Sequence, residues 1–367
     1  MLDLASMLHA ALIGFPSSGK TTLFQLMTSA RDAPRGKGDV AIGISRVPDA
    51  RLDTLSAMYN PRKHTNATIE FTDIVAPRAN AQALVDVAGY KNADALVHVV
   101  RAFRDETVAH PSGSVDPARD AQAMEDELIL ADLGVAERRL ERIEKDLKKG
   151  RAVELERERD LVHRCRTRLE EGQPLRSLDL PGEDLKRLRG FQFLSAKPLL
   201  LVINLDETDL IDVGADVIKA AERTGLTAFL ANASTRAVAL CAKIELEIAQ
   251  LDPADAAAFL QDLGLPESGL DRVIATTYAL LGYMSFFTVG EDECRAWSIA
   301  RGTVAQMAAG EIHSDIQRGF IRAEVVAYAA LTGRGNMAAC RDHGEVRLEG
   351  KEYVVQDGDI INFRHAT

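Results

Sequence analysis

The sequence is poor in cysteine. Its 367 residues include only four cysteines, Cys165, Cys241, Cys294 and Cys340, which stand far apart and form no Cys-x-x-Cys pair. Disulfide frameworks and structural zinc modules need closely spaced cysteines, so the pattern argues against both. The few scattered thiols fit a protein of the reducing cytoplasm.

The sequence also lacks long apolar runs and an excess of positive charge. No apolar run reaches about 18 residues, the length of a membrane-spanning helix. Residues 1–11 lack the basic start and long apolar core of a secretory signal. The formal net charge is −11, whereas proteins that coat nucleic acid are basic. We therefore expect no membrane and no DNA partner, and any contact with RNA must use a local basic patch.

What the sequence does contain is an alternation of strand-like and helix-like segments. With 46% apolar and 27% charged residues, the chain can bury a sizeable core, and its length allows two or three domains. Helical stretches separate the strand-like runs, which predicts a doubly wound α/β domain over residues 1–282. The predicted buried parallel strands are residues 8–15, 67–75, 95–100, 198–204 and 226–232.

Two regions depart from this alternation. In residues 120–178, apolar residues recur at spacings of 3 and 4, which predicts two antiparallel helices that turn near Gly150. Their charges form either a solvated surface, which the interleaved acidic residues favour, or an arm that contacts a partner such as ribosomal RNA. Residues 283–367 hold short strand-like runs between glycine turns, which predict a small mixed β domain.

Residues 14–21 carry the strongest motif. They match the phosphate-binding pattern G-x-x-x-x-G-K-[ST], between a predicted strand and a predicted helix. Such glycines let backbone N–H groups wrap a phosphate, and the helix directs its positive end there. We expect Lys20 to reach the β- and γ-phosphates and the Thr21 hydroxyl to bind Mg²⁺. The predicted contacts are Gly14, Pro16, Ser17, Ser18, Gly19, Lys20, Thr21 and Thr22.

Residues 204–207 carry a signal for the base. A Ras-like GTPase reads guanine with Asn-Lys-x-Asp after a buried strand. Here Asn204 is followed by Leu205 in place of Lys, and by Glu207 in place of the shorter Asp, which alters the guanine-reading geometry. Asn204 alone also suits a turn at a strand end. Cys241 and Ala242 begin a Cys-Ala-Lys segment similar to the Ser-Ala-Lys loop that offers a backbone N–H to the base.

Taken together, these segments resemble the YchF family, a branch of the Obg-related P-loop NTPases. VPDARLDTLSAMYNPRK (47–63), HPSGSVDPARD (110–120) and RLEGKEYVVQDGDIINFR (347–364) are similar to family segments, and the resemblance covers nearly the whole chain. It implies a cytoplasmic protein that binds and slowly hydrolyses ATP, associates with ribosomes, and carries a coiled-coil insertion and a C-terminal TGS domain. It also implies adenine rather than guanine, because the family has the Asn-x-x-Glu pattern found here.

Two departures from the family lie where hydrolysis is controlled. The sequence keeps Asp73, expected to hold Mg²⁺ through a water, but has Ala76 and then Pro77 where the family has a glycine. The first switch has no threonine between positions 29 and 43, so the usual second hydroxyl for Mg²⁺ is missing there. His110 falls on the family's histidine and is a candidate to orient or deprotonate water, the alternative being a surface-loop residue.

The sequence therefore predicts a P-loop NTPase domain with an inserted helical hairpin, followed by a TGS domain of β-grasp, ubiquitin-like fold. We expect ATP, or GTP, to bind with Mg²⁺ and to be hydrolysed slowly, so that the nucleotide sets the affinity for a ribosomal partner that contacts the hairpin and the TGS domain. Two alternatives stay open: a nucleotide-binding scaffold without hydrolysis, which the altered switches favour, and a GTP-dependent translation GTPase. A small-molecule kinase is disfavoured, because the sequence shows no acceptor site or arginine-rich lid.

Overall fold

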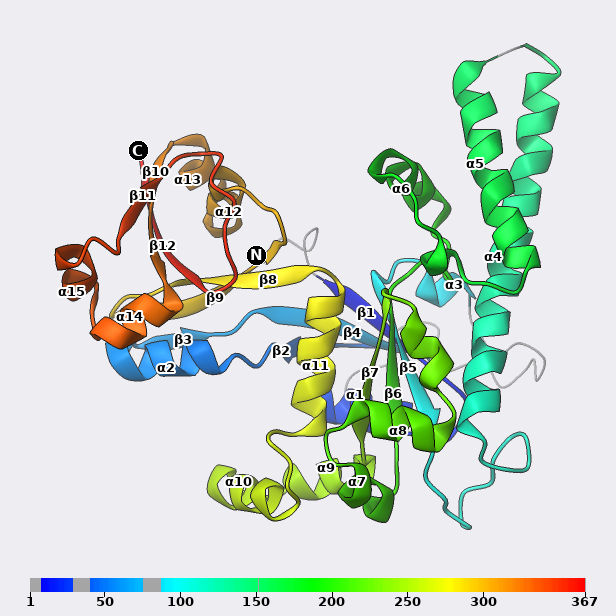
Figure 1. Ribbon diagram of the computed structural model, residues 1–367, viewed down its shortest axis with the longest axis horizontal. Coiled ribbons are helices and arrows are strands. Elements are labelled where there is room, and N and C mark those ends of the chain that lie inside the picture. The colour runs from blue at the N-terminus through cyan, green and yellow to red at the C-terminus, as the bar shows by residue number, and fades with distance from the viewer. Residues whose placement is uncertain (1–7, 29–39, 75–86, 151, 367) are drawn as a thin grey trace. The chain divides into compact units, whose positions relative to one another are not determined.

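The computed structural model describes residues 8–28, 40–74, 87–150 and 152–366. The chain divides into two compact units that are not contiguous in sequence. Unit 1 comprises Met1–Ser45 and Glu70–Leu280, and unit 2 comprises Arg46–Ile69 and Leu281–Thr367. Each unit is built on its own sheet of six strands (Figure 1). The fold is therefore mixed α/β with two sheets, and the domain boundary at residue 282 stays a prediction.

The sheet of unit 1 has the strand order β2-β4-β1-β5-β6-β7. Its strands β4, β1, β5, β6 and β7 pair in parallel, so their carboxyl ends meet at one edge. Every residue of β5 and β6 is buried, as expected for strands covered on both faces. The bounds are β1 His9–Ile13, β2 Val40–Arg46, β4 Thr68–Ile74, β5 Ala95–Arg101, β6 Leu199–Asn204 and β7 Thr235–Leu240.

Helices surround this sheet and close its core (Figure 1). Leucine, isoleucine and valine side chains of β5 and β6 pack there with alanines and leucines of α4 and α8. No helix in the described ranges is long and apolar enough to span a membrane. The helices are α1 Lys20–Thr28, α3 Val87–Tyr90, α4 Pro117–Leu147, α5 Val153–Glu170, α6 Gly182–Leu188, α7 Glu207–Val213, α8 Val217–Thr224, α9 Ala242–Ile248, α10 Pro253–Asp262 and α11 Gly269–Leu280.

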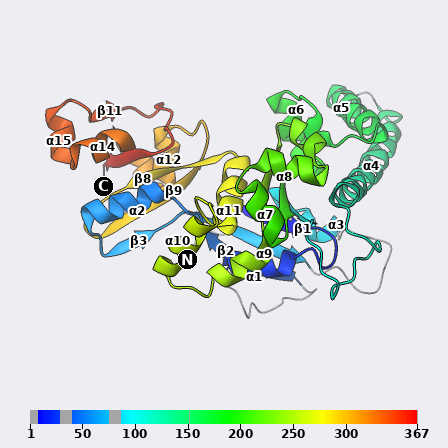
Figure 2. The same ribbon diagram turned by 60° about the horizontal axis from the view of Figure 1, so that its bottom comes forward.

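Helices α4 and α5 lie side by side in both ribbon views (Figures 1 and 2). Asp116 starts α4, because its side chain accepts a hydrogen bond from the backbone N–H of Arg119 and Pro117 follows at the first helical position. The seam between the helices is a buried apolar cluster that includes Ala136, Leu140, Val162, Cys165 and Leu169.

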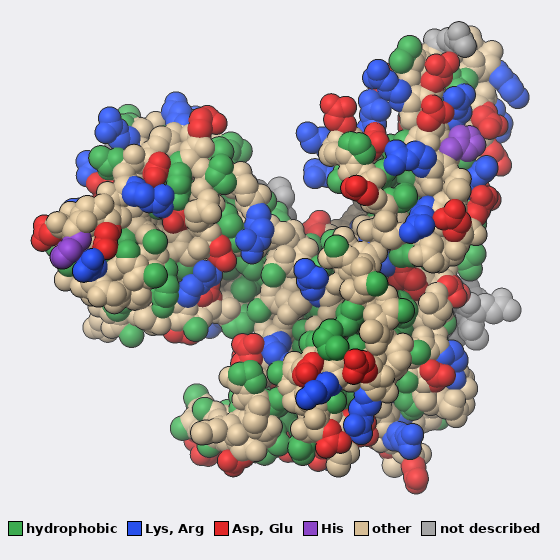
Figure 3. Space-filling view, in the orientation of Figure 1, with side chains coloured by type: hydrophobic (Ala, Val, Ile, Leu, Met, Phe, Trp, Pro, Cys, Tyr) green, Lys and Arg blue, Asp and Glu red, His purple; other side chains and the backbone are tan. Residues whose placement is uncertain are grey.

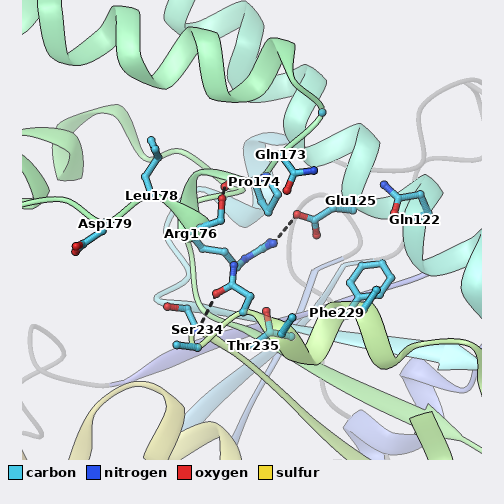
Figure 4. A pocket seen from close by; sticks show the side chains of 16 residues that line it. Gln122, Glu125, Gln173, Pro174, Arg176, Leu178, Asp179, Phe229, Ser234 and Thr235 are labelled. Carbon is cyan, nitrogen blue, oxygen red and sulfur yellow. Dashed lines mark hydrogen bonds and ion pairs between the residues drawn. The ribbon is translucent and has the colours of Figure 1, made fainter. Parts of the chain in front are cut away.

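A buried polar network fastens α4 to the segment before β6, and Figure 4 shows one part of it, the pair of Arg176 and Glu125. The Asp132 carboxylate accepts from the backbone N–H groups of Leu194 (2.8 Å) and Ser195 (2.7 Å), and burial raises the pKa of Asp132 to about 6. Arg176 pairs with Glu125 of α4 at 2.5 Å and donates through Nε to the carbonyl of residue 197 at 3.0 Å. Buried charges are stable only when paired in this way.

Unit 2 has the strand order β11-β10-β12-β8-β9-β3, with β10 antiparallel to both β11 and β12 and β8 antiparallel to β9. Phe286, Phe320, Phe363 and Ala308 lie in its apolar core. Residues 46–69 supply α2 and β3 to this unit. The bounds are α2 Ala50–Tyr59, β3 Lys63–Thr65, β8 Tyr283–Thr288, β9 Glu293–Ala300, α12 Ala305–Ile312, α13 Ser314–Arg318, β10 Phe320–Ala327, α14 Tyr328–Arg334, α15 Met337–Asp342, β11 Arg347–Glu349 and β12 Asp359–His365.

One predicted strand is wrong. Residues 227–231 form a 3₁₀ helix, η4, and the strand β7 begins only at Thr235. Gly225 ends α8 with a left-handed φ of 72°, after which Phe229 donates its backbone N–H to the carbonyl of Leu226. A short apolar run does not distinguish a strand from a buried helical turn, because both bury the same side chains.

Candidate functional site

The loop of residues 14–19 joins β1 to α1 at the carboxyl edge of the parallel sheet. Gly14 has a φ of 142°, and a Cβ there would collide with the carbonyl oxygen of Val99. Gly19 has a φ of 100°, and a Cβ there would lie 2.5 Å from the side-chain nitrogen of Asn204. Both positions therefore require glycine, which lets the loop pass close to β5 and β6.

The exposed tip of the loop is Pro16 and Ser17, and Ser17 has a left-handed φ of 62°. Ser18 is buried behind it, and its Oγ has no hydrogen-bond partner among the residues that the structure describes. Helix α1 then starts at Lys20, with Thr22 half-buried on it. A glycine loop before a helix N-terminus is an arrangement that binds phosphate through backbone N–H groups.

The Lys20 ammonium folds back onto the loop. Its Nζ donates to the carbonyl oxygens of Gly14 at 2.8 Å and Phe15 at 2.7 Å. Burial lowers the pKa of Lys20 to about 8, and nearby Asp73 opposes that shift. A buried cation with only backbone carbonyls as partners gains from a phosphate oxygen, so Lys20 is placed to receive one.

Thr21 and Asp73 meet at the same edge. The Thr21 hydroxyl donates to Asp73 Oδ2 at 2.8 Å, and Asp73, on strand β4 beside β1, is 2% exposed. One hydroxyl and one carboxylate are hard oxygen ligands, and Mg²⁺ takes its remaining ligands from phosphate and water. These two residues therefore fit a Mg²⁺ ion bound together with a nucleotide.

Asn204 ties the phosphate loop to the loop after β7. Its side-chain nitrogen donates to the carbonyl of Ser18 at 2.9 Å, and its oxygen accepts from the backbone N–H of Ala242 at 3.0 Å. Asn204 is 2% exposed, so both contacts are shielded from water. The structure thus brings the two ends of the predicted nucleotide site together through one amide.

The other residues predicted to contact the base are of two kinds: some can offer only their backbone, and one has its side chain at the surface. The side chains of Leu205 and Cys241 belong to the apolar core, so only their backbone can face a ligand. Glu207 is the first residue of α7, and its half-exposed carboxylate pairs with Lys243 of α9. The carboxylate is held by Lys243 at the surface.

His110 is buried. Its side chain is 3% exposed, and Nε2 lies 2.8 Å from Oδ2 of Asp120, in the first turn of α4. Its ring centroid lies 6.1 Å from that of Phe15, in the phosphate loop. The side chain of His110 is thus turned inward from its loop and lies next to the candidate site, and its part in hydrolysis stays a prediction.

Three polar residues around this site were not predicted from the sequence. His98 of β5 lies beneath Gly14, and burial lowers its pKa to about 3, so its imidazole is neutral. Arg101 at the end of β5 donates to the carbonyls of Phe103, Asp105 and Val108, which shapes the loop before His110. Asp120 is the third. For His98 and Arg101 the signal was present, because polar residues interrupt an otherwise apolar parallel strand. Asp120 lies in α4 and had no such signal.

The two departures from the family pattern at the switch segments lie mainly outside the described residues. Ala76 and Pro77 lie in residues 75–86, and most of the threonine-free stretch lies in residues 29–39. The effect of these departures on hydrolysis stays a prediction.

A pocket of about 630 Å³ lies elsewhere in unit 1 (Figure 4). It is lined by Glu125 and Arg176 of the buried network, by Phe229, and by Thr235, the first residue of β7. It therefore lies toward the amino end of β7, whereas Ala242 and the phosphate loop follow the carboxyl ends of their strands. None of the predicted site residues lines it.

Comparison with known proteins places the chain in a family. It is 40% identical over 366 residues to the "Ribosome-binding ATPase YchF" of Bacillus subtilis (strain 168), covering 97% of this chain and 99% of that protein. The chain belongs to the YchF family. It is also 33% identical over 377 residues to "Obg-like ATPase 1" of Oryza sativa subsp. japonica, covering 98% of this chain and 92% of that protein.

Two further comparisons agree with this YchF membership. The family model YchF-GTPase_C, described as "Protein of unknown function (DUF933)", matches residues 283–366. The solved structure of the Schizosaccharomyces pombe YchF GTPase superimposes with a TM-score of 0.84 at 28% identity, covering 97% of each chain.

Proposed function

We propose that this YchF protein binds ATP with Mg²⁺, hydrolyses it slowly, and uses the bound nucleotide to control its association with the ribosome in the cytoplasm. The observation that carries the nucleotide site is Asn204, whose buried amide joins the phosphate loop to the backbone at Ala242. The names of several relatives, "Ribosome-binding ATPase YchF", support both the nucleotide and the partner. We propose that residues 1–282 form a P-loop NTPase domain with its helical hairpin at residues 120–178, and that residues 283–367 form the TGS domain.

The proposed mechanism depends mainly on positioning and charge. Lys20 leaves the loop carbonyls to neutralise the β- and γ-phosphates, while backbone N–H groups of residues 14–19 hold the chain of phosphates. Thr21 and Asp73 would hold Mg²⁺, which supplies charge neutralisation at the phosphates when it is bound. His110, beside the phosphate loop, is the candidate to accept a proton from water.

The preference for ATP rests on Glu207. Guanine recognition in related folds needs a carboxylate that accepts from the ring N–H and amino group of the base. Glu207 has a longer side chain than the usual Asp, and its carboxylate is paired with Lys243 at the surface. Guanine therefore lacks its specific acceptor, and the backbone around Leu205 and Ala242 serves adenine.

A basic groove beside the hairpin supports contact with ribosomal RNA. The groove, of about 630 Å³, is lined by five basic and two acidic side chains: Lys91, Arg138, Arg139, Arg142, Arg187, Glu154 and Glu158. Arg139 pairs with Glu158 and Arg187 with Glu154, so the groove keeps net positive charge. Lys and Arg side chains gather on this part of the surface amid acidic ones (Figure 3). A local positive groove on an acidic protein suits a phosphate backbone.

Phosphate release by the purified protein tests the enzymatic part of the proposal. We expect Lys20→Ala to reduce release by about 100-fold or more, because the charge that meets the transferring phosphoryl group is lost. Lys148→Ala, at the end of α4, is a matched control that should leave the rate unchanged. Equal rates for the wild type and Lys20→Ala would contradict the proposal and leave the nucleotide-binding scaffold, provided that a fluorescent ATP analogue still binds.

Competition between ATP and GTP for a fluorescent analogue tests the base. We expect ATP to displace the analogue at lower concentration than GTP. A preference for GTP of about tenfold, or 1.4 kcal/mol, would reject the adenine assignment and favour the translation GTPase.

A further inference from the structure

We propose that Asp120 is a positioning residue for His110, holding the imidazole by Nε2 so that Nδ1 can accept a proton from water. The inference rests on the proposed hydrolysis, and it adds a residue from the first turn of the hairpin helix α4 to the site. The two ring nitrogens of His110 contact different partners: Nε2 contacts Asp120, and Nδ1 contacts Ser112. These two partners differ in rigidity.

The Nε2 side of His110 is closed and buried. His110 and Asp120 are 3% and 4% exposed, and Nε2 and Oδ2 approach to 2.8 Å as an ion-pair contact. Neither atom has a hydrogen bond of normal geometry in the described residues, so this ion-pair contact is the polar contact that the structure gives each of them. A buried imidazole N–H or carboxylate oxygen without a partner is destabilising, so the contact stabilises the burial of both groups.

The Nδ1 side fixes the tautomer. The backbone N–H of Ser112 lies 3.1 Å from Nδ1 and donates to it, so Nδ1 carries a lone pair and the proton sits on Nε2, the nitrogen that contacts Asp120. A carboxylate next to the protonated nitrogen is the arrangement that makes the opposite nitrogen a base.

The two partners differ in rigidity. Asp120 belongs to a helix of 31 residues, and its other oxygen, Oδ1, accepts from Nε (2.9 Å) and Nη2 (2.8 Å) of Arg119. Ser112 belongs to a tight turn, which is closed by a hydrogen bond from Gly113 to the carbonyl of His110 at 2.9 Å. The turn contains Gly113 with a φ of 80° and open space around it. We infer that the turn opens to free Nδ1, while Asp120 stays in place.

The step that this arrangement serves is a balanced transfer. Nδ1 takes a proton from water as the water oxygen bonds to the γ-phosphorus. The bond from that phosphorus to the bridging oxygen breaks, and its electron pair leaves with ADP. The proton gained at Nδ1 makes an imidazolium beside the Asp120 carboxylate, which stabilises it, and the proton then passes to solvent.

Steady-state phosphate release by Asp120→Asn tests the proposal in the full-length protein. We expect kcat to fall about 10- to 100-fold with KM for ATP within about threefold of the wild type, because the residue acts through His110 and not on the nucleotide. Asp126→Asn is the matched control, since this exposed aspartate of the same helix pairs only with Gln122 in the described contacts. It should leave kcat unchanged. An unchanged or raised kcat in Asp120→Asn would overturn the proposal.

Two further measurements separate this inference from loss of the fold and from failure of the proposed function. In a His110→Ala background, adding Asp120→Asn should change kcat by less than about twofold, and a further tenfold loss would contradict the inference. Nitrogen-15 NMR of labelled histidine, assigned with His110→Ala, should show the Nε2-protonated tautomer in the wild type and mixed tautomers in Asp120→Ala. This reading needs no hydrolysis, and a wild-type imidazole protonated on Nδ1 alone would overturn the inference.

Discussion

The two ends of the candidate nucleotide site are built from different kinds of interaction. At the phosphate end, Gly14, Lys20 and the pair Thr21–Asp73 are fixed by close backbone approach and partly buried polar contacts. At the base end, a buried amide at Asn204 is followed by an ion pair between half-exposed Glu207 and exposed Lys243. Buried hydrogen bonds contribute strongly to the free energy of unfolding, whereas exposed ion pairs contribute about 0–1 kcal/mol to it. Phosphate binding is therefore rigidly specified, and base choice rests on weak interactions.

The largest effect is expected at the phosphate end, for Gly14→Ala. The new Cβ meets the Val99 carbonyl at a φ of 142°, and neither strand can move aside in the buried sheet. We expect about 3 kcal/mol or more of lost stability and at least about 100-fold weaker nucleotide binding, measured by denaturant unfolding and by titration. Gly172→Ala, with a φ of 68° and open space, is the matched control and should cost about 1 kcal/mol. Equal costs would mean that the close approach does not matter.

A smaller effect is expected from pH, again at the phosphate end. Lys20 has a pKa of about 8 in the free protein, and phosphate binding favours its charged form. Below pH 8 the ammonium is already charged, so affinity should change little through this residue. Above pH 8 binding must take up a proton, so Kd for ATP should rise by up to about tenfold per pH unit. Lys20→Arg, which keeps its charge, should remove this rise. A flat profile in the wild type would show that Lys20 does not change charge on binding.

The smallest effect is expected at the base end. Lys243→Met releases the Glu207 carboxylate from its ion pair, and we expect the ratio of ATP to GTP affinity to change by about threefold or less. Glu207→Gln, which also breaks the ion pair but removes the carboxylate, should not shift the ratio toward GTP. Competition titrations against one fluorescent analogue measure both variants. A shift of tenfold or more would show that the base end is as tightly specified as the phosphate end.

Patterns with a local cause could be predicted from the sequence. The phosphate loop and strands β1, β5 and β6 follow from residue spacing and continuous apolar runs, and they lie where expected. The prediction of a strand at residues 226–232 was wrong, because a short apolar run does not distinguish a strand from a buried helical turn. The carboxylate beside His110 was not predicted, although Asp120 lies only ten positions away. A loop joins the two residues, and only its folded path brings the side chains together.

The single uninterrupted helix α4 has a mechanical consequence. It has 31 residues, so it is a rod about 46 Å long at 1.5 Å per residue. Asp120 lies near one end of this rod, and Leu147 is its other end. Asp132 fastens this rod near its middle, so a tilt of about 5° about that point moves each end by about 2 Å. The rod is thus a balanced beam, in which a displacement at one end is matched by a similar, opposite displacement of Asp120 relative to His110.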